Sequence, residues 1–293
     1  MFVPRSRVHH EHQPPGLPQL CVVQWNLLAD GLAAMRPDKG GFTHGLDPRF
    51  LDWSHRSELI WAHLKDLEAD VLCFEECDHP EFLRDKLCPR GYSCFFKAKR
   101  QSPCLEFSTL EDGCFLAFKS SRFNLLGQHE FFLGDNANQC GILVALHDSH
   151  FNVKLIACVS HLKAAKDEQG ELVRTRQTQV ILHEIELMST RLDIQNIIYC
   201  VDMNATPKSE SYGLLLSAGF LSSYVSCMGC EPRFTTCKQR DKLVEMVIDY
   251  VFFKGSFVCQ SVLDSPSEPA PLPTQHYPSD HLMLWVALSC CLD

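Results

Sequence analysis

The chain has 293 residues, 45% of them hydrophobic, and a formal net charge of -9. This size and apolar content are typical of one large α/β domain with a substantial core. The acidic balance argues against non-specific binding of nucleic acid along a broad basic face, although a bound cation and a few basic side chains can reverse the potential in one cleft. No run approaches the ~20 apolar residues of a membrane span. The sixteen cysteines fall mostly within apolar runs, which indicates reduced core residues rather than disulfides.

The low apolar content of residues 1–18 predicts a disordered leader. The length of the chain favours a single folded domain over 19–293. In the first half of the chain we expect a strand at 20–25, a loop at 30–50, a helix at 52–68 capped by Ser54, and strands at 71–74, 92–96 and 114–118. A hairpin of 142–147 with 153–159 follows, and then a helix at 172–188, a strand at 197–201 and a helix at 209–218 that Gly219 ends. The last expected elements are a strand at 247–253, a proline-rich loop at 264–278 and a strand at 282–288. Because the strands alternate with both helices and hairpins, the pattern favours two packed mixed sheets with helices outside.

Short polar blocks stand at the ends of several of these apolar runs. They are Gln24-Trp25-Asn26, Glu75-Glu76, Ser160-His161-Leu162-Lys163, Asp202-Met203-Asn204 and Tyr277-Pro278-Ser279-Asp280-His281. A hydrophobic core disfavours such groups, whereas a site at the point where strands open into loops requires them. The blocks therefore indicate one active centre assembled from the whole chain.

Asp202 and Asn204 are two residues apart in an extended segment, so their side chains can address the same atom. A carboxylate can accept a proton from water, and a carboxamide can hold that water or a phosphoryl oxygen. An Asx turn leading into the next helix explains the pair equally well.

Glu76 ends a buried strand, where a glutamate with other oxygen ligands suits Mg²⁺, and Asn26 ends a second run of the same kind. Adjacent strand residues face opposite sides, so only one of Glu75 and Glu76 can enter the site. We expect Glu76 in the site and Glu75 in solvent.

His161 and His281 are each explained either as structural histidines or as groups that contact a phosphoryl oxygen. A carboxylate such as Asp249 can fix the tautomer of an imidazole. The chain has no Gly-x-Ser-x-Gly turn, Walker loop or dinucleotide glycine motif. Metal-assisted attack of water on a phosphoester therefore fits the residue types best.

The blocks, together with Asp112-Gly113-Cys114, Ser102-Pro103-Cys104-Leu105 and Ile248-Asp249-Tyr250, resemble the endonuclease/exonuclease/phosphatase superfamily and, within it, the nocturnin-like deadenylases. The resemblance runs from about residue 20 to the end. It implies a four-layer α/β sandwich that forms a catalytic domain with its site at one end of the sheets. It further implies that Glu76 binds Mg²⁺, or Mn²⁺ as a substitute, with Asn26 and Asp280 beside the metal.

For the reacting groups, the resemblance implies that Asp202 handles the attacking water and Asn204 orients the phosphate. His281, oriented by Asp249, would stabilise phosphoryl charge, and His161 would contact the phosphate from the other side. The residues expected to bind the rest of the substrate are Lys97, Lys99, Lys163 and Arg240.

The implied substrate is an adenine nucleotide, with removal of the 2′-phosphate of NADP(H) as the first hypothesis. The alternatives are 3′ to 5′ removal of poly(A) from RNA, and a module that keeps the fold but binds without efficient catalysis. We expect no DNA substrate, a monomer, and a cytoplasmic location, or a mitochondrial one if a longer leader precedes the chain.

Three positions depart from the pattern of the family. Val201 replaces a glycine before Asp202, which predicts strain if the backbone there needs positive φ. Ala165 replaces an arginine, where Lys166 could supply only a point charge. Cys237 replaces a tryptophan on the side expected to bind the base.

Overall fold

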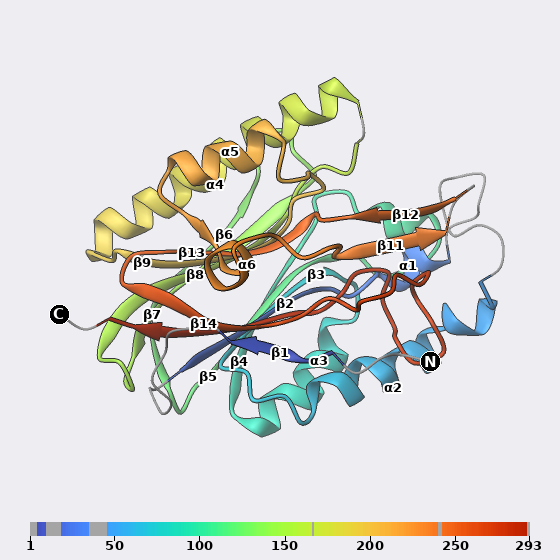
Figure 1. Ribbon diagram of the computed structural model, residues 1–293, viewed down its shortest axis with the longest axis horizontal. Helices are drawn as coiled ribbons and strands as arrows, with labels where there is room; N and C mark the ends of the chain where they lie inside the picture. Colours follow the sequence, from blue (N-terminus) through green and yellow to red (C-terminus); the bar gives the residue numbers. More distant parts are fainter. Residues whose placement is uncertain (1–4, 10–18, 35–45, 166, 240–241, 292–293) are drawn as a thin grey trace.

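The computed structural model describes residues 5–9, 19–34, 46–165, 167–239 and 242–291. Within these residues, two mixed β-sheets pack face to face and helices cover their outer faces (Figure 1). The first sheet has the strand order β1 (Arg7–His9), β14 (Phe257–Leu263), β15 (Leu284–Cys290), β2 (Leu20–Asn26), β3 (Val71–Cys77), β5 (Gly113–Lys119) and β4 (Tyr92–Ala98). The second has the order β10 (Leu221–Ser222), β13 (Asp249–Lys254), β9 (Asn196–Asp202), β8 (Val153–His161), β7 (Cys140–Asp148) and β6 (Phe123–Phe132).

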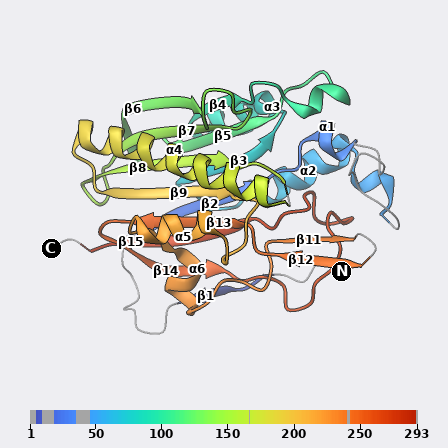
Figure 2. The same ribbon diagram turned by 90° about the horizontal axis from the view of Figure 1, so that it is seen from above.

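The remaining elements are the hairpin β11 (Thr236–Gln239) and β12 (Leu243–Met246), the helices α1 (Asp30–Ala33), α2 (Trp53–Leu64), α3 (Pro80–Leu87), α4 (Glu168–Leu192), α5 (Glu210–Ser217) and α6 (Ser223–Met228), and the 3₁₀ turns η2 (Pro48–Phe50), η3 (Cys88–Arg90) and η4 (Pro103–Glu106). Helices α4 and α5 lie on the far side of the second sheet from the first sheet, whereas α2 and α3 lie beyond the first (Figure 1). Seen from above, α4 and α5 lie in front of the strands (Figure 2). The predicted four-layer α/β sandwich is therefore confirmed.

Three apolar clusters correspond to the interfaces between these layers. The central cluster joins the inner faces of the two sheets through side chains such as Val22, Val71 and Ile142. A second cluster packs α2 and α3 onto the first sheet, and a third packs α4 and α5 onto the second. Full burial of each aliphatic side chain contributes about 1.5–3 kcal/mol, so the three clusters together hold the strands in place around the site.

Most predicted elements are present, with shifted ends. The helix expected over 52–68 ends at Leu64, and its cap is Asp52, whose carboxylate accepts the Ser54 N–H at 2.9 Å; the prediction of Ser54 as the cap is wrong. The loop expected over 30–50 contains α1 and η2 within its described part. Of the predicted leader, residues 1–4 and 10–18 lie outside the described residues, and Arg7–His9 pair with β14.

The sheet topology brings the polar blocks to one end of the molecule. Strands β2 and β3 run parallel, as do β8 and β9, so their polar C-terminal residues lie at the same edge. Strands β13, β15 and β5 run antiparallel to these neighbours, so their N-terminal residues meet the same edge. All the blocks named above therefore converge at one end of the two sheets.

Candidate active site

Asp202 lies at the centre of the site, between strands on both sides. In the sheet register, Asp202 of β9 is paired with His161 of β8 and with Asp249 of β13. All three side chains are buried. The backbone ladder thus sets three potential catalytic groups in one row across three strands.

Two hydrogen bonds hold the carboxylate of Asp202. Asn26 Nδ2 donates to Oδ2 at 2.9 Å, and the backbone N–H of Asn204 donates to Oδ1 at 2.9 Å. Burial, followed by the charge of Asp249, raises the pKa of Asp202 to about 7. At neutral pH this carboxyl group can therefore accept a proton from a nearby donor.

His281 and Asp249 form a buried dyad. Nδ1 of His281 lies 3.0 Å from each carboxylate oxygen of Asp249. The hydroxyl of Thr235 donates to Asp249 Oδ2 at 2.6 Å and accepts the N–H of Asp249 at 3.1 Å. Burial acts to lower the pKa of His281, but Asp249 and Asp280 outweigh it and raise that pKa to about 9. The imidazole is therefore held with a proton on Nδ1, and its Nε2 faces away from the dyad.

Lys238 meets the other face of His281 and was missing from the predicted site. Its ammonium group lies 2.5 Å from Asp280 Oδ2 and 3.4 Å from His281 Nε2. Lys238 stands two residues after Thr236 in β11, and Thr236 is bridged to His281. Because alternate residues of a strand share a face, this bridge places Lys238 beside His281. The bridge joins segments far apart in the chain, so the sequence alone gives no signal for it.

His161 and Asn204 contact each other across the row. Asn204 Nδ2 lies 2.9 Å from His161 Nε2 and 3.2 Å from the carbonyl oxygen of Leu162. Burial, reinforced by Lys99, lowers the pKa of His161 well below its usual value. The imidazole is thus neutral at neutral pH, and its Nε2 accepts the amide N–H.

The two adjacent glutamates both lie within the protein. The register of β3 against β5 shifts between Phe74 and Cys77, and Glu76 has φ of 49°, so the simple alternation of strand faces is interrupted. Glu75 is 0% exposed and accepts Gln24 Nε2 at 2.8 Å. The prediction that Glu75 is solvated is therefore wrong.

The sequence matches the Endonuclease/Exonuclease/phosphatase family over residues 23–281. The chain belongs to this family. It is 32% identical to nocturnin of Xenopus laevis over 281 residues, which cover 90% of this chain and 70% of the frog protein. It is 31% identical to human nocturnin over 288 residues, covering 92% of this chain and 65% of the human protein. A solved structure of the human nocturnin catalytic domain with bound sulfate superposes with a TM-score of 0.80 and 27% identity, covering 98% of both chains.

The chain is thus a nocturnin-like member of the Endonuclease/Exonuclease/phosphatase family, and it is a hydrolase of phosphoester bonds. No helix among its described residues is long and apolar enough to cross a membrane.

The donor groups of this family member fit a divalent metal ion. Ligand atoms of Glu76, His161 and Asp202 all lie within 4.8 Å of one another. Asp280 Oδ1 is buried and has no hydrogen-bond partner, as expected of an oxygen beside a cation site. Glu76 is partly exposed, with Oε2 3.4 Å from the N–H of Ala29 and Oε1 4.0 Å from His161 Nε2. Oxygen donors of this kind suit a hard divalent ion.

The predicted substrate lysines are placed very differently from one another. Lys99 is buried and paired with Asp112 at 2.5 Å. Burial acts to lower the pKa of Lys99, but Asp112 and Glu76 outweigh it and raise that pKa. Lys97 instead lies 3.9 Å from Glu130, and Lys163 is exposed. Arg240 and Lys166 lie outside the described residues.

The departures from the family pattern leave the local backbone intact. Val201 lies inside β9 and is not among the described non-glycine residues that have positive φ. The predicted backbone strain at Val201 is therefore absent. Arg174 of α4 donates to the carbonyl oxygens of Lys163 and Ala165, at 3.0 and 2.5 Å. Cys237 is fully buried in the cluster under α2.

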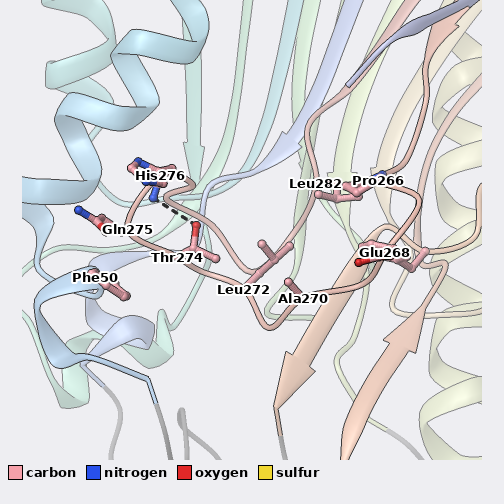
Figure 3. A pocket seen from close by; sticks show the side chains of 10 residues that line it. Phe50, Pro266, Glu268, Ala270, Leu272, Thr274, Gln275, His276 and Leu282 are labelled. Carbon is pink, nitrogen blue, oxygen red and sulfur yellow. Dashed lines mark hydrogen bonds between the residues drawn. The ribbon is translucent and has the colours of Figure 1, made fainter. Parts of the chain in front are cut away.

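An apolar pocket of about 310 Å³ is lined by residues that include Phe50, Leu272 and Leu282 (Figure 3). Phe234 and Leu282 line it, whereas their neighbours Thr235 and His281 contact Asp249. Adjacent residues of extended segments face opposite ways. The pocket therefore opens on the reverse side of the segments that carry the dyad and is separate from the catalytic row.

Proposed function

We propose that this protein is a divalent-metal-dependent phosphatase that removes the 2′-phosphate of an NADP(H)-type nucleotide. The observation that carries the proposal is the approach of Lys238 Nζ to within 3.4 Å of His281 Nε2. Nδ1 of His281 is committed to Asp249, so in the imidazolium form Nε2 also carries a proton. Asp280 pairs with Lys238, so these two adjacent donors carry more positive charge than that one carboxylate offsets. A further anion that accepts from both would stabilise them, and a phosphoryl oxygen is such an acceptor.

The row of side chains supplies the other groups that hydrolysis needs. Asp202 is placed to take the proton of an attacking water, and Asn26 orients its carboxylate. The new bond from the water oxygen to phosphorus replaces the bond to the 2′-oxygen. The 2′-oxygen leaves as a hydroxyl with a proton taken from solvent, and Asp202 returns the proton of the attacking water to solvent. When bound by Glu76, with Asn26 and Asp280 beside it, Mg²⁺ or Mn²⁺ would neutralise charge on the phosphoryl oxygens.

The charge distribution supports a small substrate over a long RNA. The net charge is -9, and the described cations beside the row include the buried Lys99 and the partly exposed Lys238, each paired with an aspartate. A long single strand gains affinity from an extended basic groove, whereas one terminal phosphate needs only a compact anion site. Likeness to the nocturnins supports the same choice of an adenine nucleotide.

Two assays run side by side test this function. Inorganic phosphate released from NADPH is measured with malachite green, and shortening of poly(A) is followed on a gel, both with Mg²⁺. We expect phosphate release that the Asp202→Asn and Glu76→Gln substitutions reduce by about 10²-fold or more. AMP release from poly(A) without phosphate from NADPH would replace the proposed reaction by deadenylation. Absence of both activities would favour a binding module.

A further inference from the structure

Arg56 of α2 is a fully buried arginine whose hydrogen bonds go to backbone carbonyl oxygens, with one longer ion pair to Asp30. Its Nη1 donates to the carbonyl oxygens of Leu28 at 2.7 Å, Leu27 at 3.1 Å and Pro278 at 3.3 Å. Its Nε donates to the carbonyl oxygen of Leu51 at 3.2 Å. One guanidinium therefore joins three segments that are far apart in the sequence.

The first of these segments carries the asparagine that holds the central carboxylate. Leu27 and Leu28 directly follow Asn26, whose Nδ2 donates to Asp202. The N–H of Leu28 donates to Asn26 Oδ1 at 3.0 Å, and Leu28 has φ of 60°, an unfavourable value for this residue type. The next N–H, that of Ala29, faces Glu76. A shift of this turn would therefore move both Asn26 and the partner of Glu76.

The second segment carries the phosphate-facing imidazole. Pro278 precedes Ser279-Asp280-His281. Ser279 Oγ donates to the carbonyl oxygen of Asn26 at 2.6 Å and accepts the N–H of His281 at 3.1 Å. The two segments therefore meet directly, and Arg56 joins the same two segments from the α2 side.

The charge of Arg56 is costly to bury, so its retention needs a reason. Its nearest carboxylate is Asp30 Oδ1, 3.8 Å from Nη2, and Nη2 itself has no hydrogen-bond partner. An apolar side chain could fill the same space without a desolvation cost. Only the planar fork of a guanidinium can donate in several directions at once, and an ammonium group cannot reproduce that geometry.

We propose that Arg56 is a positioning residue for phosphoester hydrolysis, which sets the spacing between Asn26 on one segment and His281 on the other. This inference rests on the proposed function. Arg56 forms no hydrogen bond with Asn26 or His281 themselves. It binds carbonyl oxygens of residues that lie one to three positions away from them in the sequence. Its loss should therefore impair the chemical step more than substrate capture.

The test compares Arg56→Lys and Arg56→Ala with the wild-type protein. We expect kcat to fall about tenfold or more in both variants, while KM changes by less than about threefold. Guanidinium chloride at non-denaturing concentration should restore part of the kcat of Arg56→Ala, whereas methylammonium should not. The matched control is Arg90→Ala, which removes an exposed arginine that stacks over Trp61 of the same helix at 4.3 Å.

A second readout separates this inference from the proposed function. Binding of Mn²⁺, followed by electron paramagnetic resonance, should weaken about tenfold in Arg56→Lys, because the charge is kept while the turn that faces Glu76 is released. If the wild-type protein binds Mn²⁺ but hydrolyses nothing, the proposed function fails. The difference in Mn²⁺ affinity between the wild-type protein and Arg56→Lys still tests the positioning role of Arg56. Wild-type kcat and Mn²⁺ affinity in both variants would overturn the inference. Loss of the folded state in both would also overturn it, by assigning Arg56 to folding alone.

Discussion

Glu75 and Glu76 illustrate how a local irregularity can defeat a rule based on alternation. A regular strand would send one of them to solvent, but the shifted register in β3 and the positive φ of Glu76 leave both inside the protein. Burial, followed by the charges of Asp202 and Asp249, raises the pKa of Glu75 well above its usual value. Burial thus favours the protonated, neutral form of Glu75, whereas Glu76 is partly exposed and suited to a metal ion.

Substitutions of Glu75 and Glu76 by glutamine test the different roles of these two glutamates, with each variant as the control for the other. Glu75→Gln should retain phosphatase activity within about threefold, because a neutral carboxamide matches a protonated carboxyl in shape and can still accept the Gln24 N–H. Glu76→Gln should lose about 10²-fold or more under the same conditions. Phosphate release and urea unfolding measured on both variants check this. A similar loss of activity in both would contradict the assignment of a neutral Glu75.

The pH dependence of kcat/KM follows from Asp202 and His281. Asp202 must be ionised to accept a proton, so activity should rise with pH through about 7. His281 must be protonated to donate to a phosphoryl oxygen, so activity should fall above about 9. Asp249→Asn should move both limbs to lower pH, because Asp249 raises both pKa values. A basic limb that stays in place would contradict the role of the dyad.

The residue types at strand ends were enough to predict which polar side chains meet in one row. Asp202, His161 and Asp249 could be recognised because carboxylates and imidazoles rarely end buried strands without a purpose. Thr235 was missed because a threonine beside a strand is ordinary, and only its contact with Asp249 gives it a role. The positions of the lysines expected to bind substrate could not be predicted, because the sequence does not show in which direction a long charged side chain extends.

At the scale of elements, strands that carry continuous apolar runs were predicted well. Strands β2, β3 and β9 are almost entirely buried, so their composition alone distinguishes them from loops. Strand β6 was missed because it lies at the edge of its sheet and most of its residues are exposed. Helix α3 was missed because its eight residues give too short a period to recognise.

The segment before β11 offers a prediction at this scale, because Thr235 links it to the start of β13. Thr235→Val removes the hydroxyl that donates to Asp249 and accepts the N–H groups of Ile248 and Asp249. Unfolding should become easier by about 1–3 kcal/mol, since buried N–H groups lose their acceptor. The same change should lower kcat about tenfold, because the dyad carboxylate loses its orienting partner.

Urea denaturation and phosphate release from NADPH measure the two effects of Thr235→Val. Thr235→Ser is the matched control, because it keeps the hydroxyl and should retain most of both properties. Equal behaviour of the valine and serine variants would show that the hydroxyl has no part in orienting Asp249.

For the whole molecule, the charge distribution predicts a weak dependence on salt. With a net charge of -9 and a compact anion site, kcat/KM for NADPH should change by less than about threefold between 50 and 200 mM salt. A protein that neutralised six or more phosphates of a nucleic acid would lose about 10³-fold in affinity over this range. Steady-state kinetics at a series of NaCl concentrations measure the slope. A steep decline would favour a polyanionic substrate.

The pairing of His161 and Asp249 with Asp202 has a consequence for how the active centre tolerates sequence change. Main-chain hydrogen bonds space these three groups, and those bonds form whatever side chains surround them. Relatives can therefore exchange most of the surrounding residues while the distances between the reacting groups stay constant. The same arrangement ties the groups into one cooperative unit, so the amide protons of this row should exchange with solvent only when the second sheet opens as a whole.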